Sequence, residues 1–309
     1  AGAAGPAVVF ESAASGTSTN SRISICTVGS DGFAGSNDPH IVMVYEDAGN
    51  SNRLTTVVGT VADMKMSFGT PVPFGGVQTA AGAGLDIFPS SYTNMAVIIV
   101  YRDSSNSNYG TAIVGTVSGD TMTFQSPQVF ESAAIMQPRI TSLQNSGRFV
   151  FAYTDDGNFG KATAMVVSMN TTTKILTFGS PIVYGPASGH GARMDITYSN
   201  YPSPASVGIV IVYTDLGNSN YFTAIVGSVD FPNMSITFGS PTVFYATNTQ
   251  HKAHVMYENN NSMKIVVAWK NSSNVGRARV ATISGSPSAP AISFGTEAGF
   301  TSNNIDDDF

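Results

Sequence analysis

The sequence predicts an all-β protein built from five tandem repeats, each with four short strands. Three observations predict it: one segment recurs along the chain, strand-forming runs follow each other in a constant order, and helical periodicity is absent. Runs of Val, Ile, Thr, Tyr and Phe bounded by Gly, Asn, Ser and Asp are typical of strands and turns. No segment combines a helix-capping residue with apolar residues spaced three and four apart.

The recurring segment has the pattern T-F-x-S-P-x-V-F and closes each repeat with an aromatic residue. Self-similarity of this kind is the signature of a repeat architecture. The closing aromatic residues are Phe74, Phe130, Tyr184, Phe244 and Phe300. The repeats accordingly span 11–74, 75–130, 131–184, 185–244 and 245–300, and 301–309 is an acidic tail or the start of a further segment.

Within a repeat the four strands are expected at similar places. The fourth repeat predicts strands at 193–198, 208–214, 222–229 and 235–244, and the second at 84–88, 96–102, 110–117 and 121–130. The run Ile209–Val212 is apolar at every position, as in sheets that are covered on both faces. Radially packed blades meet this need, and a long four-strand repeat fits a propeller better than a solenoid. We therefore predict a single five-bladed β-propeller over 1–309, with four antiparallel strands per blade; a β-sandwich is the alternative.

Both ends of the chain carry a segment that matches the last strand of a blade, and a closed ring of five blades needs only one of them. Residues Val9–Ala14 are identical to Val129–Ala134, so Pro6–Phe10 repeats the last strand of a blade. The fifth repeat already supplies its own version at 291–300. Either one end lies over the ring as an extra strand, or the chain belongs to a longer array.

The composition excludes several classes of function. Charged residues make up 11% of the chain, against about 25% in an ordinary soluble domain. The net charge is −6 and no basic patch is evident, so nucleic-acid binding is not expected. Cys26 is the only cysteine, which excludes an internal disulfide, and no apolar run reaches the roughly 18 residues of a membrane span. No cofactor motif is present.

A constant hairpin loop follows the second strand of each repeat, with one carboxylate or amide at the same place: Asp47, Asp103, Asp155, Asp215 and Asn271. This side chain is expected to cap N–H groups of the loop, while Gly or Asn adopts positive φ. The pattern x-x-D-x-G-x-S-x-aromatic resembles the Asp-box of sialidases and other β-propellers. In those families the Asp-box is structural, so the resemblance implies a fold and no activity. A calcium loop needs more acidic ligands, so we predict no metal site here.

Two kinds of aromatic residue accompany this hairpin. Trp269 stands where the other repeats have Tyr, and we expect it in the core between blades. Tyr109 and Tyr221 follow the turn, where they either pack in the core or stack on a sugar ring.

The chain as a whole is similar to a repeat type of structural and adhesive proteins from marine bacteria and their phages. The segments that carry this similarity are Gly110–Asp120 with Phe124–Phe130, and Phe222–Val229 with Phe238–Phe244. The resemblance implies an extracellular, cell-surface or virion component. Its implied partners are surface glycans or neighbouring subunits of a larger assembly.

One polar residue precedes an aliphatic residue in the first strand of every repeat: Arg22, Asp86, Arg139, Asp195 and His254. First strands of propeller blades line the central channel, so these five side chains form a candidate channel ring. Buried charges are rare unless they are paired. The ring is therefore an ion-paired plug, a ligand or anion site, or a pair of catalytic carboxylates. If it is a buried ion-pair network, Asp86→Asn and Asp195→Asn should lower the melting temperature sharply.

No complete catalytic constellation is recognisable. The leading interpretation is a non-enzymatic structural or adhesive module that binds glycans. The alternative is a glycoside hydrolase, sialidase-like or of another propeller type, whose carboxylates would be Asp86 and Asp195. A sialidase also needs three arginines and a Tyr/Glu pair, and neither a third arginine nor a nearby Glu occurs at that register.

Overall fold

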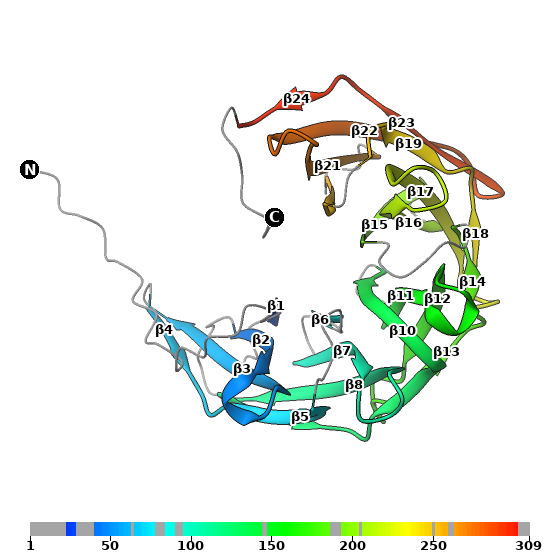
Figure 1. Cartoon of the computed structure of the whole chain (residues 1–309). Helices are drawn as coiled ribbons and strands as arrows, with labels where there is room; N and C mark the ends of the chain where they lie inside the picture. Colours follow the sequence, from blue (N-terminus) through cyan, green and yellow to red (C-terminus); the bar gives the residue numbers. More distant parts are fainter. Residues whose placement is uncertain are drawn as a thin grey trace, which may run out of the picture. The chain divides into compact units, whose positions relative to one another are not determined.

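The computed structural model of the chain (Figure 1) describes the following residues: 23–28, 40–62, 65–77, 84–89, 95–143, 147–185, 193–203, 206–248, 251–258 and 263–301. The chain divides into two compact units, Ala1–Ser132 with Thr171–Ile175, and Ala133–Asn170 with Leu176–Phe309. Two short 3-10 turns, η2 (Ala48–Asn50) and η3 (Asp156–Asn158), are the only helical segments of the described residues. The stretch Pro6–Phe10, Arg22 and the tail from 302 onward lie outside the described residues, and the expectations for them stay predictions.

The first unit holds the strands of the first two repeats. In the first repeat β1, β2, β3 and β4 pair in this order, and β5 also pairs with β3. The second repeat has the same arrangement in β6 to β9, with the beginning of β10 beside β8. The bounds are β1 (Ile23–Val28), β2 (His40–Asp47), β3 (Arg53–Ala62), β4 (Lys65–Phe68), β5 (Val72–Val77), β6 (Leu85–Pro89), β7 (Ala96–Asp103), β8 (Tyr109–Ser118) and β9 (Thr121–Phe124).

The second unit holds the other three repeats, whose sheets follow one another in sequence order (Figure 1). Their bounds are β10 (Gln128–Ser142), β11 (Arg148–Asp155), β12 (Lys161–Met169), β13 (Leu176–Phe178), β14 (Ile182–Val183), β15 (Met194–Ser203), β16 (Ser206–Asp215), β17 (Tyr221–Asp230), β18 (Ser235–Phe238), β19 (Thr242–Tyr245), β20 (Ala253–Tyr257), β21 (Lys264–Lys270), β22 (Gly276–Ser286), β23 (Ala289–Phe294) and β24 (Ala298–Gly299).

The described strands form four sheets, of five, nine, five and five strands. The nine-stranded sheet contains two repeats, because β10 carries the end of the second repeat and the first strand of the third. The fold is therefore all-β with several antiparallel sheets. A β-sandwich, which has two sheets, does not fit this arrangement.

The fourth strand of each repeat differs from its prediction. We expected one strand over 235–244, but the structure has β18 and β19, both paired with β17. Pro241 lies in the gap, where it has no N–H to donate to β17. Gly239, which follows β18, continues the hydrogen bonding to β17, since its N–H donates to the carbonyl of Val226 at 2.9 Å. The same bond recurs in the other four repeats.

The central strands of the second, third and fourth repeats, β7, β11 and β16, are buried on both faces, as their composition predicts. In the fifth repeat the central strand β21 is buried on one face only, since Val266 on its other face is 42% exposed. In β16, Ile209, Ile211 and Tyr213 belong to a core shared with the sheet of the third repeat. The alternate residues Val210 and Val212 belong to a second core, shared with the sheet of the fifth repeat. One strand thus serves two cores, which a sheet with a solvated face cannot do.

The expectation that Trp269 lies in the core between sheets is confirmed. Its side chain is fully buried and meets the ring of Phe244 from the preceding repeat edge to face, with centroids 5.4 Å apart. In the preceding repeat Tyr213 meets Tyr184 in the same manner, at 5.6 Å. Edge-to-face pairs of this kind add to the stability gained by burying the rings.

Glycine at the start of the Gly-Ser-Pro segment permits close contact between neighbouring sheets. A Cβ on Gly239 would lie 1.7 Å from the carbonyl oxygen of Pro290, near the start of β23. On Gly179 it would lie 2.3 Å from the carbonyl oxygen of Met234, at the matching position of the fourth repeat. Gly295 holds the same motif position in the last repeat, but the nearest atom to its Cβ is Val280 O, at 3.3 Å in its own sheet.

This difference gives a matched pair of substitutions. We expect Gly239→Ala to destabilise the protein by about 1–3 kcal/mol, because the methyl group overlaps the main chain of the next sheet. Gly295→Ala should cost much less, since its methyl group meets only the Val280 carbonyl oxygen, in a tight contact of 3.3 Å that a small shift relieves. Thermal unfolding followed by circular dichroism measures both. Equal melting temperatures for the two variants would show that this contact does not hold neighbouring sheets together.

Candidate functional site

The first strands of four repeats carry the predicted polar residues at one register. Asp86 lies in β6, Arg139 in β10, Asp195 in β15 and His254 in β20. Arg22, immediately before β1, is outside the described residues. In each strand the polar residue precedes an aliphatic residue that is buried or partly buried, so the polar side chains repeat at one place in their sheets.

In the second unit, Arg139 connects the first strands of two neighbouring repeats. Its Nε donates to the main-chain carbonyl of Met194 in β15, at 3.2 Å, and its Nη1 donates to the carbonyl of Pro138, at 2.9 Å. These described contacts go to peptide oxygens. The guanidinium therefore satisfies the main chain between β10 and β15.

Asp195 makes the next connection in the same direction. Its Oδ2 accepts a hydrogen bond from the N–H of Val255 in β20, at 3.1 Å, and lies 3.2 Å from Nδ1 of His254. Burial by itself would raise the pKa of Asp195. Hydrogen bonding from His254, the nearby charge of Lys252 and the Val255 N–H together outweigh it and lower the pKa below its ordinary value. The folded chain thus favours the carboxylate form of Asp195.

The first unit has a related contact at Asp86. Its Oδ1 accepts from the hydroxyl of Ser24 in β1, at 2.9 Å, and from the N–H of Ile87, at 3.0 Å. Cys26 lies on the same strand as Ser24. Burial, with a smaller effect from Asp86, raises the pKa of its thiol, so Cys26 stays protonated and is a poor nucleophile.

The polar register therefore holds together the first strands of adjacent sheets within each unit. Three of its side chains, Asp86, Arg139 and Asp195, are engaged with groups of a neighbouring first strand. Nδ1 of His254 lies 3.2 Å from Oδ2 of Asp195, a contact that is an ion pair when the histidine is protonated. His254 keeps 42% of its side chain exposed, so one end of this pair is accessible to solvent.

The hairpin side chains cap their loops through hydrogen bonds to main-chain N–H groups. Oδ1 accepts from Gly49 N in the loop of Asp47, from Ser105 N in that of Asp103, from Asn158 N in that of Asp155, from Gly217 N in that of Asp215, and from Ser273 N and Val275 N in that of Asn271, all at 3.0–3.1 Å. These hydrogen bonds stabilise the turns.

The expectation that Gly or Asn adopts positive φ in these hairpins is confirmed for Asn52 and Asn220, at 57° and 59°. The serine before each, Ser51 and Ser219, adopts it as well, and the loop glycine Gly49 does not. Asn tolerates this conformation, and the serine is held there by the preceding capped turn. Tyr109 and Tyr221, which follow these pairs, are half-buried.

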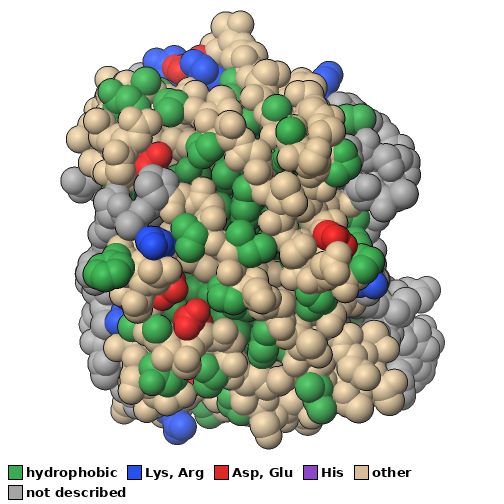
Figure 2. Space-filling view, turned by 90° about the vertical axis from the view of Figure 1, so that its right-hand side faces the viewer, with side chains coloured by type: hydrophobic (Ala, Val, Ile, Leu, Met, Phe, Trp, Pro, Cys, Tyr) green, Lys and Arg blue, Asp and Glu red, His purple; other side chains and the backbone are tan. Residues whose placement is uncertain are grey.

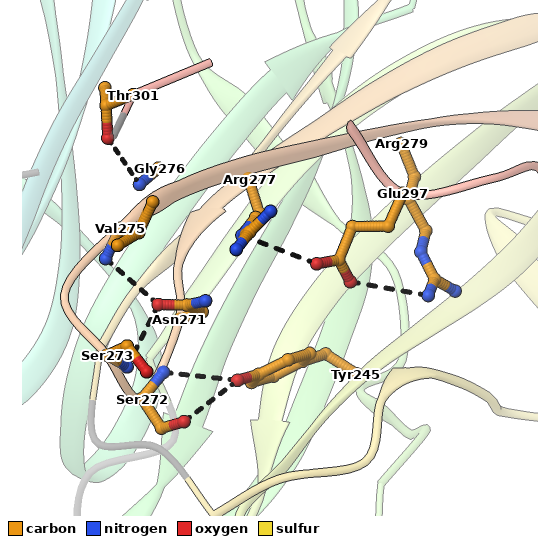
Figure 3. Close-up of polar contacts among 10 residues, drawn as sticks. All are labelled: Tyr245, Asn271, Ser272, Ser273, Val275, Gly276, Arg277, Arg279, Glu297 and Thr301. Carbon is orange, nitrogen blue, oxygen red and sulfur yellow. Dashed lines mark hydrogen bonds and ion pairs between the residues drawn. The ribbon is translucent and has the colours of Figure 1, made fainter. Parts of the chain in front are cut away.

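The structure also brings together three charged residues that sequence reasoning missed. Arg277 and Arg279 in β22 flank Glu297, in the connection between β23 and β24 (Figure 3). The signal was present in the repeat template, because the other repeats have Thr, an aliphatic residue and Pro at these positions. We call these three residues the arginine cluster.

The described residues contain neither a cluster that could hold a metal ion nor a helix that could cross a membrane. No group of three or more His, Cys, Asp or Glu residues among them could hold a metal ion. No helix in this part of the chain has the length and apolar composition needed to cross a membrane.

Comparison with solved structures identifies the type of fold. The chain is similar to the BP39L lectin of Burkholderia pseudomallei (TM-score 0.57, 12% identity, 90% of this chain and 69% of the lectin). It is also similar to the NanB sialidase of Streptococcus pneumoniae (0.52, 13%, 71% and 33%) and to a putative 6-phosphogluconolactonase of Bacteroides fragilis (0.52, 8%, 92% and 83%). These neighbours have propeller-like folds, and at such identities they establish the fold alone. No family model matches the chain, and no curated protein does.

The bonds of Asp195 predict a stability effect that depends on pH. Asp195→Ala should cost about 1–3 kcal/mol at neutral pH, because it removes the acceptor for the Val255 N–H. Asp195→Asn should lose only the stabilisation that comes from the negative charge. Since the pKa of Asp195 in the folded chain lies below the unfolded value of 3.8, this stabilisation is present above pH 3.8. It disappears as the pH falls through the folded pKa.

Urea unfolding between pH 2 and 7 measures these differences. Asp120→Asn, in an exposed turn, is the control and should match the parent protein at each pH. If the difference in free energy of unfolding between the parent protein and Asp195→Asn stays constant down to pH 2, this account of the carboxylate is wrong.

Proposed function

We propose that this chain is a non-enzymatic structural or adhesive module of a virion or cell surface, folded as a five-bladed β-propeller and able to bind glycans. It acts outside the cell. Its partners are surface glycans or neighbouring subunits of a larger assembly, and it needs neither a cofactor nor a metal. The function is one of display and attachment.

The observation that carries this proposal is the use of the polar first-strand residues as connectors. Arg139 donates a hydrogen bond to the carbonyl of Met194, and Asp195 accepts one from the N–H of Val255, each on the first strand of the next repeat. A carboxylate that must accept protons during catalysis needs access to substrate, whereas these groups face the main chain of a neighbouring sheet. The geometry favours a stabilising role over catalysis.

The surface agrees with an exposed attachment module. On the face in Figure 2, charged side chains are few and scattered, and most of the surface consists of uncharged polar groups and backbone. Only 11% of all residues are charged, while Ser, Thr, Asn and Gly are abundant. Hydroxyls and amides both donate and accept hydrogen bonds, which suits recognition of sugar hydroxyls. A lectin and a sialidase among the structural neighbours support a carbohydrate-related role.

The competing proposal is a glycoside hydrolase on the same fold. Two carboxyls on first strands, Asp86 and Asp195, and the fold shared with a sialidase favour it. The lowered pKa of Asp195 suits a nucleophile or a base and opposes a general acid, which needs a raised pKa. This alternative predicts that turnover disappears in Asp195→Asn.

The five-bladed ring itself can be tested by imaging. We expect single-particle images of the isolated chain to show a toroid with five lobes, because each repeat supplies one four-strand sheet with two apolar faces. The repeat boundaries predict that deleting 245–300, one whole repeat, prevents closure and promotes aggregation. A particle with another number of lobes, or an extended row, would refute the closed five-bladed ring.

A glycan array with a parallel assay for reducing sugar separates the two functions. We expect retention of specific glycans without release of sugar, because the carboxylates of Asp86 and Asp195 already accept hydrogen bonds from Ser24 and from the Val255 N–H. Release of reducing sugar that is lost in Asp195→Asn would establish the hydrolase instead. If neither binding nor release occurs, the role is architectural, and contacts should then be found with neighbouring subunits.

A further inference from the structure

The last repeat departs from the common template at three positions. Four repeats have Thr near the start of the third strand, namely Thr55, Thr111, Thr163 and Thr223, whereas the fifth has Arg277 at the matching position. Two residues later an aliphatic residue or methionine is replaced by Arg279. In the Phe-x-x-Pro segment of the other repeats, proline is replaced by Glu297. The other repeats thus serve as an internal reference for what packing alone requires.

These threonines have a purely structural role. They are buried, and their hydroxyls donate to the carbonyl two residues earlier, as Thr223 does to Tyr221. Arginine at this position can neither make that bond nor fit that space. The replacement in the fifth repeat therefore gives up a packing contact and introduces charge, in a chain that has few charges.

The three departures meet in space although they come from different elements. Nε of Arg277 lies 3.5 Å from Oε1 of Glu297, and Nη2 of Arg279 lies 3.5 Å from Oε2 (Figure 3). Gly299 leaves room for the first arginine, because a Cβ there would lie 2.8 Å from its Nη1. The arginine cluster is thus one site with room for its side chains, and its residues are 27–33% exposed.

The arginine cluster has unused capacity to bind an anion. Its contacts of 3.5 Å are longer than the 2.7–2.9 Å typical of charge-assisted hydrogen bonds, so Glu297 holds the arginines loosely. Two guanidiniums offer ten N–H donors, of which the described contacts use one, from Arg279 to Glu297. Two positive charges against one negative also leave a local surplus, in a chain of net charge −6.

The arginine cluster lies next to an aromatic contact between two repeats. Arg277 is the cross-strand partner of Trp269, whose ring lies 5.7 Å from that of Tyr245. Tyr245 belongs to β19 of the preceding repeat, and its hydroxyl lies 3.2 Å from Ser272 N and 3.1 Å from Ser272 Oγ (Figure 3). Trp269 is fully buried and Tyr245 is half-buried, so Tyr245 is the one of these two rings that a sugar ring can reach.

We propose that the arginine cluster is the subsite that binds the oxyanion of an acidic glycan, a carboxylate or sulfate on a sugar ring. Arg277 and Arg279 bind the oxyanion through paired N–H donors, which match its planar or trigonal face of oxygens. Glu297 holds the arginines in place when the site is empty and is displaced by the ligand. This inference rests on the proposed glycan binding and identifies its ligand class and location.

The experiment measures binding of the intact chain to three probes by calorimetry: a sulfated heparin oligosaccharide, an oligogalacturonate and a neutral gluco-oligosaccharide. The variants are Arg277→Gln, Arg279→Gln, Arg279→Lys and Glu297→Gln. Arg53→Gln is the matched control, because it removes one exposed positive charge from the other unit. Melting temperatures are recorded for all variants, so that a loss of fold is separated from a loss of binding.

We expect one or both anionic probes to bind and the neutral probe to bind far more weakly. Each Arg→Gln variant should lose about tenfold in affinity or more, and binding should weaken as salt is raised. Arg279→Lys should recover only part of this loss, since lysine lacks the planar fork. Glu297→Gln should bind at least as tightly as the parent chain, because it removes the carboxylate that competes with the ligand.

Each of the following outcomes would overturn the inference. If Glu297→Gln loses binding as the arginine variants do, or the neutral probe binds equally well, the ligand is not an anion. If glycans bind and the arginine variants equal Arg53→Gln, the site is elsewhere and the proposed function stands. If all variants merely melt earlier in proportion to their loss of binding, the arginine cluster only fastens β24 to β22. Absence of any glycan binding, here and on the array, refutes both proposals together.

Discussion

Burial of the strands of the second, third and fourth repeats on both faces is the constraint on which the rest of this structure depends. In β16, alternate residues belong to two different cores. Ile209 and Ile211 pack against the sheet of the third repeat, and Val210 and Val212 pack against that of the fifth. Such a strand cannot be stable in an isolated sheet, because one apolar face would stay in water at a cost of roughly 25 cal/mol per Å². Repetition supplies the second cover, since every repeat offers its neighbour the same apolar face.

The junctions between sheets follow from this need for close contact. Gly239 lets the main chain of the next repeat approach within a distance that any side chain would block. At the other end of the sheets, Arg139 and Asp195 satisfy main-chain groups of the adjacent first strand. Apolar packing between sheets is not directional and does not fix how one sheet is aligned with the next. We infer that the hydrogen bonds of Arg139 and Asp195 and the close contact at Gly239 set this alignment.

The division of labour between repeats follows from the same logic. Positions that four of the five repeats share, such as the hairpin Asp and the buried Thr, serve turns and packing. Some departures in the fifth repeat keep the structural role, since Asn271 still caps its loop and Trp269 still fills the core. Arg277, Arg279 and Glu297 change the chemistry of their positions, which makes them candidates for a role other than packing.

The sequence by itself determined the all-β class, the repeat boundaries, the capped hairpins and the burial of Trp269, because these depend on contacts between residues near in the chain and on apolar periodicity. It also predicted which first-strand residues share a register, from Asp86 to His254. Only the tertiary structure decided that the fourth strand divides at Pro241, that Arg139 and Asp195 bond to main-chain groups, and that Arg277 meets Glu297. Side-chain partners across sheets depend on distances between repeats, and no local pattern in the sequence encodes those distances.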